Sequence, residues 1–151
     1  MDTLRVTRAA LADKTDWMRL WSDWQRHMKG TVPAEVSERS WRLALDPDSR
    51  LIILLARSRR EAVGFATVSF APFAWTGSDV AFLQDLFVSE TARGQGAGEA
   101  LLKAIYADAD GRGASQVYWM VDETDAKLQR FYAKNAIRTP YLRFMRKPWP
   151  W

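Results

Sequence analysis

Apolar positions along the chain recur with two different periods. From Asp13 to Met28 they return every three or four residues, which predicts a helix with one buried face that includes Met28. The same spacing predicts a second helix from Pro33 to Leu45, with Val36 among its inward residues. Short runs rich in aliphatic, β-branched and aromatic residues predict strands at 4–7, 51–56, 62–70 and 80–88. The run at 51–56 is continuously apolar, which is typical of a strand buried on both faces.

The second half of the chain continues in the same way. We predict a turn at 94–98, helices at 99–108 and 122–135, and strands at 116–121 and 141–146. Asp122 is suitably placed to cap the last helix. The order β-α-α-β-β-β-α-β-α-β contains a strand–helix–strand series, which favours parallel pairing near the centre. The sequence therefore predicts one α/β domain over residues 1–151, with a mixed sheet between two helical layers.

Composition excludes several kinds of site. The chain has no cysteine, so it has no disulfide, thiolate metal site or cysteine nucleophile, and its one histidine, His27, argues against a histidine-based metal site. We interpret His27 as a polar residue near a helix end and expect no metal. The net charge is +4, without a basic stripe interleaved with aromatics, so we expect no nucleic-acid partner. Neither a signal peptide nor an apolar run of about 20 residues is present, so we expect a cytoplasmic protein without a membrane partner.

The segment from Phe82 to Leu102 carries the chemical signal. It reads as strand, glycine-rich turn and helix, and such a turn directs several backbone N–H groups and the positive end of a helix dipole at one point. This is an anion site that fits a diphosphate. A P-loop would need Lys and Ser or Thr where Glu99 and Ala100 stand, and a Rossmann fingerprint would need glycine at Glu99. A tight turn without any ligand is the alternative interpretation.

The loop Arg93-Gly94-Gln95-Gly96-Ala97-Gly98 resembles the pyrophosphate loop of the GNAT superfamily of N-acetyltransferases. The preceding Leu83-Gln84-Asp85-Leu86-Phe87-Val88 resembles the Leu-Glu-Asp-Leu-Phe-Val strand of its small-amine branch, and Val117-Tyr118-Trp119 and Phe131-Tyr132 match downstream elements. The resemblance implies a mostly antiparallel sheet with a splayed parallel strand pair. It also implies transfer of acetyl from acetyl-CoA, in a ternary complex, to a primary amine of a small molecule.

The resemblance also assigns cofactor contacts. Backbone groups of Leu86 and Val88 would pair with pantetheine, Phe87 would also contact the cofactor, and the Val88 N–H would stabilise the oxyanion. The diphosphate would be held by the loop and the helix start: Arg93, Gly94, Gln95, Gly96, Ala97, Gly98 and Glu99. Tyr132 would protonate the departing thiolate, although a core tyrosine is the alternative. Asp125 stands where the family often has Asn, and it is a weaker candidate for contact with the cofactor.

The acceptor side departs from the family pattern. Gln84 replaces the usual Glu and cannot act as a base, which leaves Asp85, Glu90 or water. Strand alternation puts Gln84 and Asp85 on opposite faces, so we expect at most one of them to face the acceptor. The weaker acceptor-binding candidates beside these two are aromatic residues whose helical spacing or loop position is also typical of packing: Trp21, Trp24 and Trp75.

Two other functions and an assembly are compatible with these residues. The first is peptide N-acetylation, which would require an open loop at 72–78. The second is an acyl-CoA-binding module that has lost catalysis, which is compatible with the two departures from the family pattern at Gln84 and Asp125. The resemblance implies a homodimer, in which the strand predicted at 141–146 would pair with a second copy.

Overall fold

The computed structural model describes residues 4–147, which form two compact units, 4–119 and 120–147. The first unit holds the sheet and three helices, and the second holds α4. The elements in chain order are β1 (Leu4–Arg8), η1 (Leu11–Asp13), α1 (Lys14–His27), α2 (Ala34–Leu45), β2 (Leu51–Ser58), β3 (Glu61–Phe73), β4 (Ser78–Val88), η2 (Glu90–Ala92), α3 (Ala97–Gly111), β5 (Gln116–Tyr118) and α4 (Ala126–Ala133).

The five strands lie in the order β1-β2-β3-β4-β5. The first four are antiparallel neighbours, and β5 pairs with β4 in parallel, which confirms the predicted mixed sheet. The parallel ladder joins Val80–Phe82 to Gln116–Tyr118. The last six residues of β4, 83–88, therefore extend past the part of β4 that β5 covers.

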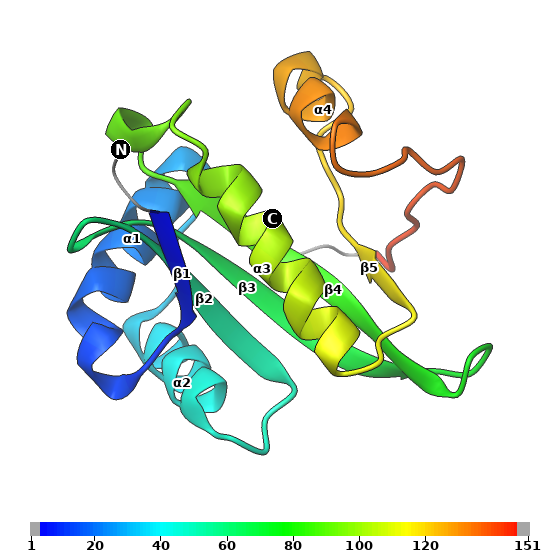
Figure 1. Ribbon diagram of the computed structural model, residues 1–151, viewed down its shortest axis with the longest axis horizontal. Coiled ribbons are helices and arrows are strands. Elements are labelled where there is room, and N and C mark those ends of the chain that lie inside the picture. Colours follow the sequence, from blue (N-terminus) through cyan, green and yellow to red (C-terminus); the bar gives the residue numbers. More distant parts are fainter. Residues whose placement is uncertain (1–3, 148–151) are drawn as a thin grey trace. The chain divides into compact units, whose positions relative to one another are not determined.

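Helices cover both faces of this sheet, as the sequence predicts. Ile53 and Leu55 of β2 pack in one buried cluster with Trp17 of α1 and Trp41 of α2. Because side chains alternate along a strand, Ile52 and Leu54 point to the opposite face. That face is covered by α3, which lies in front of the sheet in Figure 1.

Stacked indoles join α1 and α2. The ring centroid of Trp17 is 5.5 Å from that of Trp21 and 5.1 Å from that of Trp41. The indole N–H of Trp21 donates to the hydroxyl of the buried Ser37 at 2.9 Å. Each stacked pair stabilises the fold by about 0.5–1.5 kcal/mol beyond the apolar area it buries. Trp21, one of the acceptor-binding candidates, thus packs against the core.

Two inward positions predicted from periodicity are wrong. Met28, just after α1, is 59% exposed, and Val36, in the first turn of α2, is 38% exposed. Both lie at helix ends, where the sheet no longer covers the apolar stripe. Helical spacing identifies the stripe but not how far along the helix it is covered.

The last helix, in the second unit, begins later than the sequence predicts. Asp125, and not Asp122, is the N-cap of α4, because its Oδ1 accepts a hydrogen bond from the Leu128 N–H at 2.9 Å. Asp122 instead accepts bonds from the N–H and hydroxyl of Thr124. These bonds hold the pKa of the Asp122 carboxyl below its ordinary value.

The strand predicted at 141–146 is also wrong. Described residues from 138 to 147 form no regular element, and the Tyr141 and Phe144 side chains are 85% and 91% exposed. Alternation of apolar and basic residues favours a strand only where another strand supplies hydrogen-bond partners. The predicted strand at 116–121 is likewise shorter, ending at Tyr118. In residues 4–147 no helix has the length and apolarity required to cross a bilayer.

Candidate active site

The glycine turn lies between β4 and α3. Gly94 and Gly96 have φ angles of +76° and +88°, a region that side chains with a Cβ rarely adopt. Gly96 is the N-cap of α3, and its carbonyl accepts the Ala100 N–H at 2.9 Å. The amides of Ala97 to Glu99 therefore have no acceptor within the helix, and they point outward with the positive end of its dipole. The turn has the geometry of an anion site.

Two long side chains brace this turn. The Arg93 Nε–H donates to the Val88 carbonyl at 3.1 Å, and its guanidinium lies 5.9 Å from the Phe87 ring centroid. The Gln95 amide donates to the Thr91 carbonyl at 3.2 Å. Arg93 thus keeps a positive charge close to the end of β4 and fixes the path of the loop.

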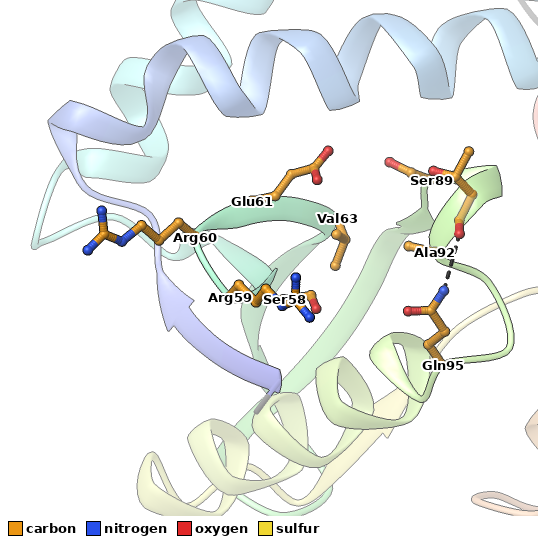
Figure 2. A pocket seen from close by; sticks show the side chains of 9 residues that line it. Ser58, Arg59, Arg60, Glu61, Val63, Ser89, Ala92 and Gln95 are labelled. Carbon is orange, nitrogen blue, oxygen red and sulfur yellow. Dashed lines mark hydrogen bonds between the residues drawn. The ribbon is translucent and has the colours of Figure 1, made fainter. Parts of the chain in front are cut away.

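A hollow of about 430 Å³ borders the same turn. Figure 2 shows Ser89, Ala92 and Gln95 on one side of it and the β2–β3 turn, Ser58 to Glu61, on the other. The Ser89 hydroxyl is buried without a hydrogen-bond partner in the described part of the chain. The hollow lies on the β3 side of β4 and is lined largely by polar side chains.

A close backbone approach positions the end of β4. Gly64 of β3 pairs with Val88, and a Cβ on Gly64 would lie 2.6 Å from the Phe87 carbonyl oxygen. No real Cβ tolerates that contact, so a side chain here would push β4 away from β3. Glycine at this position therefore allows the strand end to reach its observed place.

Replacing Gly64 by Ala is expected to destabilise the protein by about 1–3 kcal/mol and, if the end of β4 holds the cofactor that the family resemblance implies, to weaken acetyl-CoA binding. Urea unfolding and a thermal shift with acetyl-CoA measure the two effects. Gly30→Ala is the matched control, because a Cβ there meets nothing within 4 Å. Unchanged stability and binding in Gly64→Ala would show that β4 does not need this approach.

A β-bulge changes the faces presented by β4. Thr67 pairs with Asp85 while Val68 pairs with Leu83, so Gln84 is an extra residue in β4. The Gln84 amide donates to the Ser69 hydroxyl at 3.0 Å, and the Thr67 hydroxyl bonds to the Asp85 carboxyl.

Thr67 and Ser69 are two residues apart on one strand and face the same side. The prediction that Gln84 and Asp85 lie on opposite faces is therefore wrong. The bulge interrupts the alternation, so both side chains reach the face of β3 that carries Thr67 and Ser69.

The Asp85 carboxyl is partly buried under α1. The Trp24 indole N–H donates to its Oδ1 at 2.9 Å, and the Trp24 ring lies 5.7 Å from the Phe87 ring. Burial raises the pKa of Asp85 above its ordinary value, while the bonds from Trp24 and Thr67 act in the opposite direction. A carboxyl in this environment has lone pairs left for an ammonium or a proton.

The first unit holds two further acceptor-side candidates, Trp75 and Glu90, outside the cluster around Asp85. Trp75 is 91% exposed in the turn that connects β3 to β4, and Glu90 is exposed in η2. The sequence reasoning missed Thr67 and Ser69. They are polar residues at alternate positions of the buried strand β3, and that pattern was the available signal.

In the second unit, Tyr132 lies in α4 and Asp125 is the N-cap of that helix. Burial, followed by the charge of Asp125, raises the pKa of Tyr132 to about 12. The phenol therefore stays protonated at neutral pH and can donate a hydrogen bond. One Asp125 oxygen is already used to cap α4. Over residues 4–147, no group of three or more His, Asp or Glu side chains is arranged to hold a metal ion.

The profile of the acetyltransferase (GNAT) family matches residues 14–136. The chain belongs to this family. It is 32% identical over 147 residues to the D-amino-acid N-acetyltransferase HPA3 of Saccharomyces cerevisiae, covering 96% of this chain and 91% of the yeast protein. A shorter stretch of 59 residues is 46% identical to an aminoglycoside N(6')-acetyltransferase of Klebsiella aerogenes, covering 37% of this chain and 38% of that one.

Solved structures agree with the GNAT assignment. The aminoglycoside N-acetyltransferase AAC(6')-Iy, in complex with CoA, superimposes with a TM-score of 0.82 at 20% identity, covering 98% of this chain and 97% of that one. This likeness shows the GNAT fold. The protein is thus an acetyltransferase, as the sequence predicts, of a family that uses acetyl-CoA.

Proposed function

We propose that this GNAT protein transfers the acetyl group of acetyl-CoA directly to a primary amine of a small molecule. The observation that carries the proposal is the partly buried Asp85, which lies on the same strand that leads into the glycine turn. A proton acceptor and an anion site on consecutive segments are what amine acetylation by an anionic thioester requires. We also propose that residues 1–151 act as a single domain.

The cofactor contacts follow from the end of β4. Residues 83–88 extend past β5, so their backbone groups can pair with an extended ligand such as the pantetheine arm. The backbone of Leu86 and Val88 takes this role, with Phe87 between them as a further cofactor contact, and the Val88 N–H stabilises the oxyanion. The diphosphate binds the backbone amides of the turn and of the helix start, from Gly94 to Glu99, and Arg93 adds a positive charge.

In the reaction, Asp85 pairs with the acceptor ammonium and takes one proton from it, which frees the nitrogen lone pair to form the N–C bond to the thioester carbonyl carbon. The second proton that this nitrogen loses passes to solvent. The C–S bond of the thioester then breaks, and the electron pair leaves on sulfur. Tyr132, in the role that the family resemblance implies, donates a hydrogen bond to this thiolate, and its phenol, with a pKa of about 12, is protonated at neutral pH. Gln84, held by Ser69, orients polar groups of the acceptor beside Asp85.

The relatives suggest which amines to try first. By their names, these relatives acetylate D-amino acids and aminoglycosides, which are small molecules with primary amines. We propose the same class of acceptor, a small molecule with a primary amine, for the present chain. We do not assign it the particular substrate of either relative. A cytoplasmic location and a homodimer complete the proposal.

Thiol release from acetyl-CoA over a panel of amines tests the function directly, together with a thermal shift by acetyl-CoA. Binding at 100 times Kd stabilises a protein by about 2.7 kcal/mol, so Tm should rise by several degrees. Thiol release with at least one small amine is expected. A thermal shift without release on any amine or lysine peptide would instead identify a binding module, and release with peptides alone would identify a peptide acetyltransferase.

Tyr132→Phe is expected to lower kcat about 10- to 100-fold while leaving the Kd for acetyl-CoA nearly unchanged. The loss is limited to the bond that the hydroxyl makes to the thiolate. Pre-steady-state thiol release and calorimetric binding separate the two quantities. Tyr141→Phe is the matched control, since Tyr141 is an 85% exposed tyrosine of the same unit. An unchanged kcat in Tyr132→Phe would remove Tyr132 from the mechanism.

A further inference from the structure

The face that carries Asp85 continues along β4 into an aromatic surface. Phe82 pairs with Ser69, and cross-strand partners point to the same side of a sheet. Phe82 therefore shares a face with Thr67, Ser69 and Asp85. Gln84, whose amide donates to Ser69, lies between the carboxyl and the ring.

Two parallel rings form this aromatic surface. Tyr118 of β5 pairs with Phe82, and their ring centroids lie 5.1 Å apart with an interplanar angle of 13°. Tyr118 is 45% exposed, and Phe82 is partly exposed. An outer ring face or edge can therefore receive a third aromatic group in an offset or edge-to-face arrangement.

We infer that the acceptor of this acetyltransferase is an amine with an aromatic ring, bound with its nitrogen at Asp85 and its ring against the Phe82–Tyr118 pair. The inference rests on the proposed function and adds a substrate class to it. The carboxylate, the amide and the aromatic pair lie in one row on β4 and β5, so charge and apolar surface complement the two ends of such a molecule.

The spacing of the row limits the length of the acceptor. The register partners of Asp85 and Phe82 are Thr67 and Ser69, which are two residues apart on β3. At about 3.3 Å per residue, the carboxyl and the ring are offset by about 7 Å. An amine whose nitrogen is two or three carbons from its ring spans this offset. Phenylalanine and 2-phenylethylamine belong to this class, whereas benzylamine is too short.

The test compares acceptors matched except for the ring. The pairs are 2-phenylethylamine with 3-methylbutylamine, and phenylalanine with leucine in both enantiomers. We expect kcat/KM to be about 3- to 10-fold higher for the aromatic member of a pair. Tyr118→Leu should remove that preference and leave kcat/KM for the aliphatic member within about 2-fold, whereas Tyr118→Phe keeps the ring and the preference. Phe82→Leu should act like Tyr118→Leu.

The aliphatic acceptors also report whether the variants are folded. Leu43→Ala controls for loss of an exposed apolar side chain, because Leu43 is 49% exposed on α2, away from the row. Equal kcat/KM values within each pair, or equal losses for both members in Tyr118→Leu, would overturn the aromatic assignment and leave amine acetylation standing. Failure to release thiol with every amine would overturn the proposed function and the assignment with it.

Discussion

Asp85→Asn is expected to lower kcat/KM for amine acetylation by about 10²- to 10⁴-fold, the usual contribution of a positioned proton acceptor. Asn retains an oxygen for the Trp24 indole N–H, so the local packing is preserved. It cannot take a proton from the acceptor or pair with its charge. Initial rates of thiol release with the best amine measure the effect.

The pH dependence gives a second readout for Asp85. Catalysis needs the ionised carboxyl, so kcat/KM should fall as pH drops through its raised pKa, and Asp85→Asn should lose this acidic limb. Stability follows the opposite sign, because the folded protein holds this proton more tightly than the unfolded chain. The stabilisation is complete below the unfolded pKa and is lost as pH rises through the folded one. Asp85→Asn should therefore have the higher Tm at about pH 8, with the difference shrinking toward about pH 4.

Asp79→Asn is the matched control for these measurements. Asp79 is a carboxylate on the same strand, but it pairs with Arg50 at 2.8 Å at the far end of β4. Its replacement should leave the rate and the acidic limb as they are. If Asp85→Asn kept both, the proton would have to go to Glu90 or to water.

Replacement of Gly96 by Val is expected to raise the Kd for acetyl-CoA at least about 10-fold, with little thermal shift left at concentrations that saturate the native protein. Gly96 has a φ of +88°, which a β-branched residue adopts only with strain. Relief of that strain would rotate the peptide groups at the start of α3, and these groups supply the proposed diphosphate contacts. Isothermal titration calorimetry gives the Kd.

Gly111→Ala serves as the control for the glycine replacement. Gly111 lies in the last turn of α3, its φ is not in the positive region, and a Cβ there meets nothing within 4 Å. Alanine should therefore leave Kd unchanged and slightly favour the helix. Unchanged binding in Gly96→Val would mean that the turn connects β4 to α3 without holding an anion.

The order of elements in the first unit was accessible from the sequence because periodicity is a local property. The helix and strand signals between residues 4 and 119 need no knowledge of neighbours, and each predicted element was found within a few residues of its predicted bounds. The family motif likewise lies in one continuous segment. In contrast, the strand predicted at 141–146 needed a partner strand, which no local pattern can supply.

The bulge at Gln84 could not be predicted from the sequence for the same reason. Whether a residue is extra depends on the register with β3, and nothing in the Leu83-Gln84-Asp85 stretch states that register. The bond from Trp24 to Asp85 joins residues 61 positions apart, so it too depends on tertiary structure. The cap of α4 was ambiguous locally, because aspartate is a common capping residue type and both Asp122 and Asp125 lie within four positions of the helix start.

The bulge also means that the number of residues in β4 decides which of its side chains face the acceptor. With Gln84 present, the residues of β4 before and after it present their polar and aromatic side chains to one surface. Phe82 and Asp85 are three positions apart, so a regular ladder with the same number of residues would turn them to opposite sides, and the bulge at Gln84 is what lets them share one. Homologues that keep three positions between these two residues should accordingly keep the bulge, whereas homologues that are one residue shorter here should have a regular ladder.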